Sequence, residues 1–215
     1  MNVYLLRHVE TAANKEGRIQ GRIDIPLNDY GIELAEVTRD GIQKEGIRFD
    51  KIYSSPLIRA VQTATIVRGD REPHQIILDD RIMEMAFGKG ESLFIKDIKE
   101  KPEHANLKNC FSAPSKYIAK DGAESYEEIL ARAKDFLENE IKPLEGTCEN
   151  VLVVCHGAMI RALLLNVNGW DIDRYWEIHQ PNCCMNLLTL QEGQFEIAYK
   201  EKIYYEGNVA ARGIL

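Results

Sequence analysis

Short hydrophobic runs and amphipathic stretches alternate along the chain. Four hydrophobic runs are typical of buried strands and predict strands at 2–6, 50–53, 75–78 and 151–155. Two further apolar segments, 185–190 and 195–199, flank a Glu-Gly pair and predict a closing β-hairpin. Helical patterns lie between the early strands. This alternation predicts an α/β fold, a three-layer sandwich whose mainly parallel sheet carries helices on both faces.

Apolar residues at three- and four-residue spacing define the expected helices. Leu34, Val37 and Ile42 mark the buried face of the first helix. Ser55 is the expected N-cap of the second helix, with Pro56 at its first helical position. The buried face of that helix is expected to consist of Leu57, Ala60, Ala64 and Val67.

Two more helices follow a weakly patterned middle segment. A capping box, Ser125 to Glu128, opens a helix that runs through Leu137, and another helix begins near residue 158. Residues 87–121 show no strong period, so we expect an inserted, lid-like segment there. We interpret residues 1–215 as one domain carrying this insertion.

Composition narrows the function classes. The 215 residues carry a formal net charge of −7, which disfavours general binding to nucleic acid or to an anionic membrane. No apolar stretch approaches the ~20 residues that span a bilayer. The five cysteines form no CxxC pair, so we expect free thiols in a reducing compartment, the cytoplasm. A homodimer stays open as an alternative to a monomer.

Two histidines directly follow predicted strands. Arg7-His8 ends the first strand and His156-Gly157 ends the strand at 151–155. Because ligands bind at strand ends in open α/β sheets, both rings are expected to face one pocket. The neighbouring Arg7, together with Arg59 on the first turns of its helix, predicts an anionic ligand, most simply phosphate.

This set of residues suits phosphoryl transfer. A neutral imidazole can attack phosphorus, and nearby arginines keep it neutral by lowering its pKa. The design requires no metal and no other cofactor. Two histidines could alternatively be metal ligands, but no carboxylate or cysteine lies at ligand spacing beside either one. Taken singly, each of these residues also fits an ordinary surface or structural role.

The ordered motifs resemble the histidine phosphatase superfamily, the phosphoglycerate-mutase-like group. The resemblance covers residue 3 to about residue 165. The matching segments are Leu6-Arg7-His8-Val9-Glu10-Thr11 with Asn14, Arg18-Ile19-Gln20-Gly21 with Asp24, Pro26-Leu27 and Gly31, Ser54 to Ala64, Glu84-Met85-Ala86-Phe87-Gly88 with Glu91, Gly122-Ala123-Glu124-Ser125, and Val153 to Gly157.

The resemblance implies a role for each matching residue. His8 would be the nucleophile that carries a phosphohistidine, and Glu84 would protonate the leaving oxygen. The phosphoryl group would be held by a larger set: Arg7, Arg59, His156, Asn14, Gln20, Gly21 and the backbone N–H of Gly157. Four other carboxylates compete with Glu84 for the acid role: Glu91, Glu10, Asp79 and Asp80.

The implied activity is that of a metal-independent phosphomonoesterase, a histidine acid phosphatase-type phosphoric monoester hydrolase. Its expected partner is a small phosphorylated metabolite. Two alternatives remain, a cofactor-dependent phosphoglycerate mutase and a weakly active member that binds phosphorylated ligands. The resemblance implies that a mutase would have a longer basic segment after the catalytic glutamate. Residues 85–100 contain three lysines, three acidic residues and no arginine, which favours water over a sugar-acid acceptor.

Four positions depart from the family pattern. Val9 stands in place of the usual glycine after the histidine, and Ala13 in place of a tryptophan. Gly90 and Ser92 replace a tryptophan and a glycine around Glu91. These changes predict an altered loop around the site and bear on the substrate more than on the reaction.

Overall fold

The computed structural model describes residues 1–70 and 75–205. Its strands are β1 (Asn2–Arg7), β2 (Lys51–Ser54), β3 (Ile76–Leu78), β4 (Asn150–Cys155), β5 (Met185–Gln191) and β6 (Gln194–Lys202). Its α-helices are α1 (Ala12–Glu16), α2 (Asp29–Lys44), α3 (Ile58–Arg68), α4 (Ile95–Glu100), α5 (Ala105–Ser112), α6 (Tyr126–Phe136) and α7 (Gly157–Asn168). A short 3-10 helix, Ile172–Glu177, follows α7.

The six strands form one sheet in the order β3-β2-β4-β1-β5-β6. The pairs β2–β3, β2–β4 and β1–β4 are parallel, whereas β5 and β6 run antiparallel at one edge. The predicted α/β class is therefore confirmed, and the expected hairpin is the β5–β6 pair.

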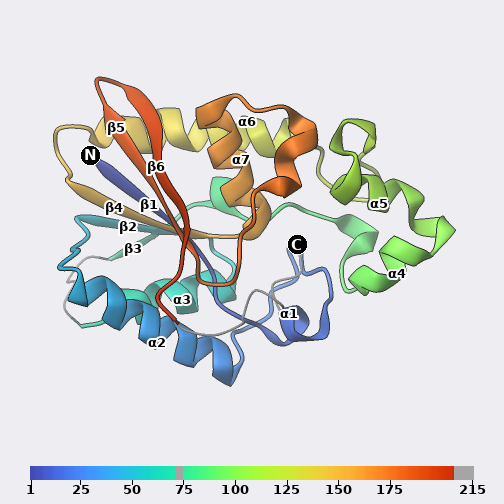
Figure 1. Ribbon diagram of the computed structural model, residues 1–215, viewed down its shortest axis with the longest axis horizontal. Coiled ribbons are helices and arrows are strands. Elements are labelled where there is room, and N and C mark those ends of the chain that lie inside the picture. The colour runs from blue at the N-terminus through green and yellow to red at the C-terminus, as the bar shows by residue number, and fades with distance from the viewer. Residues whose placement is uncertain (71–74, 206–215) are drawn as a thin grey trace.

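Helices cover both faces of the sheet, α2 and α3 on one and α6 and α7 on the other (Figure 1). Alternate strand residues divide between two cores, as the pleat of a strand requires. Val3 and Leu5 pack with residues of α6 and α7, such as Ile129. Tyr4 and Leu6 pack in the second core with residues of α2 and α3.

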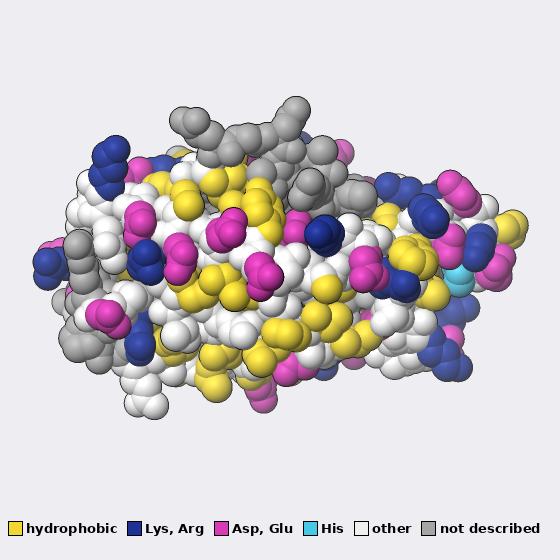
Figure 2. Space-filling model, turned by 90° about the horizontal axis from the view of Figure 1, so that it is seen from below, with side chains coloured by type: hydrophobic (Ala, Val, Ile, Leu, Met, Phe, Trp, Pro, Cys, Tyr) yellow, Lys and Arg dark blue, Asp and Glu magenta, His cyan; other side chains and the backbone are white. Residues whose placement is uncertain are grey.

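Two predicted helix details are wrong. Val37 is 45% exposed, because the buried stripe of α2 runs through Leu34, Ala35, Thr38 and Ile42 and leaves it to one side. Hydrophobic side chains are accordingly visible on the outer surface of this face (Figure 2). The second error concerns the start of α3.

The helix α3 begins at Ile58, two residues later than expected, and Leu57 rather than Ser55 is its N-cap. The Ser55 hydroxyl is bonded to His156 at 2.7 Å and accepts the Leu57 N–H at 3.4 Å. Asp24 supplies the missing acceptor, because its Oδ1 receives the Ile58 N–H at 2.6 Å. By contrast, the capping box predicted at Ser125 and Glu128 is present at the start of α6.

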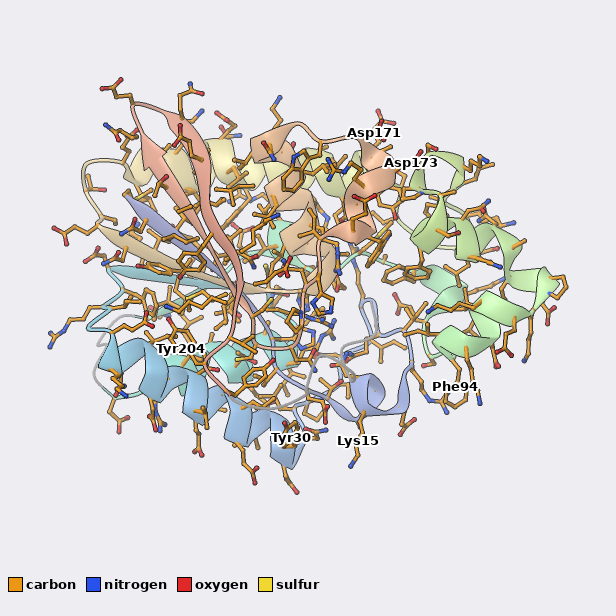
Figure 3. All side chains as sticks on the ribbon, viewed as in Figure 1. Lys15, Tyr30, Phe94, Asp171, Asp173 and Tyr204 are labelled. Atoms are coloured by element: carbon orange, nitrogen blue, oxygen red, sulfur yellow. The ribbon has the colours of Figure 1, made fainter. Side chains whose placement is uncertain are left out.

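The segment 87–121 contains α4 and α5 and extends to one side of the sheet (Figure 1). Polar contacts attach it to the rest of the chain. Both the N–H and the hydroxyl of Ser115 donate to Asp173 at 2.8 Å (Asp173 is labelled in Figure 3), and Trp176 donates to the Cys110 carbonyl at 2.6 Å. At the other side, Arg18 lies 3.6 Å above the Phe94 ring.

Among the described residues, none of the helices combines the length and apolar character needed to cross a membrane. The part of the predicted domain beyond residue 205 lies outside the described residues.

Candidate active site

The carboxyl ends of β1 and β4 bring His8 and His156 together. The two strands are parallel neighbours with Arg7 opposite Cys155, so the residues that follow them leave the sheet side by side. The His8 N–H donates to the Cys155 carbonyl at 2.9 Å. The two ring centroids are 5.2 Å apart, at an interplanar angle of 57°.

The His8 ring is held in one tautomer. Its Nδ1 lies 2.6 Å from the Val9 carbonyl, which can only accept, so Nδ1 carries the proton. Nε2 is then left with a free lone pair. Burial, followed by the charges of Arg59 and Arg7, lowers the His8 pKa well below 6.5. The ring is therefore a neutral base at neutral pH.

His156 is fully buried behind this ring. Its Nε2 lies 2.7 Å from the Ser55 hydroxyl, and its Nδ1 is buried without a partner in the described part of the chain. Burial, the Arg59 charge and the charge of His8 lower its pKa well below 6.5. His156 does not line the cavity described below, unlike the other predicted site residues.

A cavity opens beside His8. Its polar lining consists of Arg7, His8, Asn14, Arg18, Gln20, Gly21, Arg59, Glu84, Gly157 and Arg161. Its apolar lining consists of Ile19, Phe87, Ile95, Ala158 and Trp176. The lining therefore contains four arginines against one carboxylate, which makes the cavity strongly cationic although the whole chain is acidic.

Arg7 and Arg59 are positioned by backbone carbonyls rather than by carboxylates. Arg7 donates from Nη1 to the Gln180 carbonyl. Arg59 donates to the Ile23 carbonyl at 2.8 Å and to the Gly21 carbonyl at 2.7 Å. Burial lowers the Arg59 pKa to about 10, so the group stays charged at neutral pH. The charge of each guanidinium thus remains available to a bound anion.

Gly21 contributes through its backbone. Its carbonyl accepts from Arg59, and its φ of +54° favours glycine. A Cβ at this position would lie 2.1 Å from Glu91 Oε1. The Glu91 carboxylate is occupied there, because its Oε1 accepts from the N–H groups of Arg22 and Phe87.

Two side-chain amides present donors to the cavity. Asn14 Oδ1 accepts from the Thr11 N–H, and Gln20 Oε1 accepts from the Thr11 hydroxyl at 2.8 Å. Since each carbonyl oxygen is occupied, each NH₂ group is the end left without a partner among the described residues. Both amides therefore suit the oxygens of an anion.

Glu84 sits at the N-terminus of α7. Its Oε1 accepts from its neighbour Met85 and from the N–H groups of Ala158 and Met159, at 2.9, 3.2 and 3.3 Å. Helix N-termini attract negative charge, so this placement fits a carboxylate. The arrangement orients the carboxyl group toward the cavity that His8 lines.

The four competing carboxylates do not line the cavity, and three of them have other partners. Glu91 accepts from the N–H groups of Arg22 and Phe87, as described above. Asp79 pairs with Arg81 at 2.5 Å, and Glu10 accepts from Asn28 at 2.8 Å. Asp80 belongs to a 3-10 turn. This leaves Glu84 as the carboxylate of the site.

Arg161 belongs to the site and was missed by the sequence analysis. Its side chain is 1% exposed, and its Nε donates to the Ile178 carbonyl at 2.8 Å. Its Nη1 is buried without a partner among the described residues, and its guanidinium carbon lies 4.6 Å from the Trp176 ring centre. Burial lowers its pKa to about 10. In the sequence, Arg161 is the one charged residue in the apolar run 158–165, and this isolated charge could have marked it as a candidate site residue.

Comparison with known proteins decides the family. A sequence model of the histidine phosphatase superfamily (branch 1) matches residues 3–202. The chain belongs to this superfamily.

Its relatives include named phosphatases. It is 33% identical over 165 residues to the metal-independent phosphoserine phosphatase of Arabidopsis thaliana, covering 77% of this chain and 68% of that one. It is 27% identical to the adenosylcobalamin/alpha-ribazole phosphatase of Escherichia coli, covering 89% and 91% of the two chains. A mutant phosphoserine phosphatase from Entamoeba histolytica, crystallised with phosphoserine, superposes with a TM-score of 0.79 at 25% identity, covering 94% and 96%.

The positions that depart from the histidine phosphatase pattern are accommodated locally. Val9 is buried and its φ is not positive, so the side chain causes no backbone strain. Ser92, in place of a glycine, has a φ of +69°, a conformation that costs a non-glycine residue free energy. At Gly90, a Cβ would lie 2.6 Å from Leu107, so α5 fills the space beside that glycine.

Proposed function

We propose that this histidine phosphatase is a metal-independent phosphomonoesterase acting through a phosphohistidine on His8. One observation carries the proposal: a neutral histidine with a free Nε2 lines a cavity that contains four arginines and a single carboxylate. The arrangement supplies a nucleophile, charges for the phosphoryl oxygens and a proton donor.

In the first step, the phosphomonoester dianion binds to Arg7 and Arg59 with the Asn14 and Gln20 amides. His8 Nε2 forms a bond to phosphorus while the bond from phosphorus to the ester oxygen breaks. Glu84, which takes up a proton beside the bound phosphate dianion, gives that proton to the departing alcohol oxygen.

In the second step, water replaces the alcohol. Glu84, now a carboxylate, takes a proton from water, and the oxygen attacks the phosphorus of phosphohistidine. The N–P bond breaks, and its electron pair returns to Nε2. Inorganic phosphate leaves, and both His8 and Glu84 are back in their starting states. The residues of the site supply each of these steps without a metal or other cofactor.

We infer a substrate that carries a second anionic group. Arg18 is already paired with Glu16 at 2.7 Å, which leaves the charges of Arg7, Arg59 and Arg161 in the cavity lining. With Glu84 in its acid form, a phosphate dianion offsets two of these three charges. A carboxylate on the substrate would balance the third, and the apolar lining would contact its carbon chain. O-phosphoserine carries such a carboxylate, beside an ammonium group, and phosphoserine is the ligand named for the Entamoeba histolytica structure.

Water is the proposed acceptor, in preference to the sugar acid of a mutase. None of the lysines in residues 85–100 lines the cavity, and Lys89 pairs with Asp121 at 3.5 Å on the surface. A positively charged segment that would retain the product for a second transfer is therefore not found in the described lining.

The proposal also covers the cellular compartment, the binding partner and the oligomeric state of the protein. All five cysteines are free, which supports a reducing compartment such as the cytoplasm. A small phosphorylated metabolite is the proposed partner. The homodimer stays a prediction, which sedimentation analysis would test.

The first experiment compares wild type with His8→Ala on p-nitrophenyl phosphate, from mildly acidic to neutral pH, with EDTA present. We expect chelator-resistant turnover that is lost in His8→Ala, and an acid-labile phosphoprotein trapped on wild type alone. His179→Ala, which changes an exposed histidine, is the matched control and should keep full activity. Full activity of His8→Ala, or turnover abolished by EDTA, would overturn the proposal.

A further inference from the structure

Arg132 of α6 reaches the backbone that carries Glu84. It donates from Nη1 to the carbonyls of Arg81 and Met83, at 2.7 and 2.6 Å, and from Nη2 to the carbonyl of Glu84 itself, at 3.2 Å. A single guanidinium thus binds three carbonyls within four residues of chain. Arg132 does not line the cavity, so it contacts no substrate there.

The remaining donors of Arg132 form a two-point ion pair with Glu124. Nε donates to Oε1 at 2.6 Å and Nη2 to Oε2 at 2.8 Å, and the two side chains are only 15% and 8% exposed. Paired N–H···O bonds of this kind fix orientation as well as distance. Glu124 in turn accepts from the Ala86 N–H at 3.2 Å, and its own N–H donates to the Ala86 carbonyl at 2.8 Å.

The pair therefore binds the chain before, at and after Glu84. The carboxyl group at the other end of that residue is bound by the N–H groups at the start of α7. The backbone and the carboxyl group of Glu84 are thus fixed by two different helices, α6 and α7.

We propose that Arg132 and Glu124 are positioning residues that hold the acid Glu84 at the distance needed to protonate the leaving oxygen. This inference rests on the proposed function, in which Glu84 is the acid. Proton transfer is sensitive to position, since misplacing a catalytic group by about 1 Å costs roughly 100-fold in rate. Their loss should therefore affect reactions that need the acid, and spare those that do not.

The test compares two leaving groups in Arg132→Met and Glu124→Gln. With O-phosphoserine, whose alkoxide needs a proton, we expect kcat to fall roughly 100-fold with KM little changed. With p-nitrophenyl phosphate, whose leaving group needs little protonation, the fall should stay within about threefold. Adding either change to Glu84→Gln should produce no further loss on O-phosphoserine, because the acid is already absent.

Lys202→Met is the matched control. Lys202 forms a two-point ion pair with Glu45, at 2.6 and 2.7 Å, and belongs to β6 rather than to the segment that carries Glu84. It should lower stability without changing the ratio of the two activities. Circular dichroism identifies variants that fail to fold. If Arg132→Met does not fold, Arg132→Lys replaces it in the test.

Equal losses on both substrates, or a loss that adds to that of Glu84→Gln, would show a purely structural role and overturn the inference. Failure of the proposed function has a different signature. In that case Glu84→Gln itself would show no leaving-group dependence, or His8→Ala would remain active.

Discussion

At the scale of single residues, the arginines Arg7, Arg59 and Arg161 lie buried in the site without a carboxylate partner among the described residues. Arg7 and Arg59 each have a buried Nε, and Arg161 a buried Nη1, without a partner among the described residues. Buried charged groups lacking a counter-charge lower stability, and a bound anion would supply it. The guanidinium groups are held in place by backbone carbonyls, which leaves their charge for the ligand.

Arg161 gives the first prediction. Arg161→Met should lower kcat/KM for O-phosphoserine roughly 10- to 100-fold, the effect of losing a charged hydrogen bond. It should leave the thermal midpoint unchanged or raised, because an incompletely paired buried charge is removed. Kinetics on O-phosphoserine and p-nitrophenyl phosphate with a thermal melt provide the check.

The comparison of substrates assigns the role of Arg161. A larger loss on O-phosphoserine places its charge on the second anionic group, whereas equal losses place it on the phosphoryl group. The exposed Arg174→Met is the matched control and should change neither activity. No loss on either substrate would remove Arg161 from the site.

At the scale of secondary-structure elements, strand ends and helix starts build the cavity. The parallel pairing of β1 with β4 places the two histidines, and the start of α7 receives Glu84. The uninterrupted hydrophobic runs predicted both strands, and their histidines were the clearest signal in the sequence. The shorter α1 and α4 were not predicted, because five or six residues give too few positions to show a helical period.

The capping box of α6 gives the second prediction. Ser125→Ala should lower the free energy of unfolding by about 1 kcal/mol, since it removes the acceptor of the Glu128 N–H. For a chain of this size the thermal midpoint should fall by roughly 2–4 °C.

Ser125→Thr, which keeps the hydroxyl, is the control for this cap. Activity at a temperature well below the midpoint should be retained in both variants. An unchanged midpoint in Ser125→Ala would show that the tertiary contacts of α6, and not its cap, set its stability.

At the scale of the whole molecule, an acidic protein surrounds a cationic cavity. On the face shown in Figure 2, Lys and Arg side chains are interspersed with Asp and Glu side chains, at the end that carries α4 as well as at the opposite end. The protein therefore attracts a small anion locally, without the general positive charge that would attract nucleic acid.

Acid stability gives the third prediction. The His8 and His156 rings have an ordinary pKa of 6.5 when unfolded and a much lower one when folded. As pH falls below 6.5, the unfolded chain gains protons that the folded chain does not, so stability falls until the folded pKa is reached. Each ring should contribute up to about 1.4 kcal/mol per pH unit within that window.

Urea unfolding at pH 7 and at pH 5 measures this loss, which also includes the contribution of carboxylates. His8→Gln isolates one ring, because the difference between its slope and that of wild type belongs to His8. Equal slopes in the two proteins would show that His8 is protonated in the folded state at pH 5.

The sequence alone determined the α/β class, the two strand-end histidines and most of the residues that line the cavity, because these depend on local pattern and on motifs. Tertiary structure decided the rest. It assigned Ser55 to His156 instead of to a helix cap, brought Arg161 into the cavity and left Glu84 as its single carboxylate. Each of these results depends on which distant groups become neighbours, and that follows from strand order and helix packing, which residue spacing does not encode.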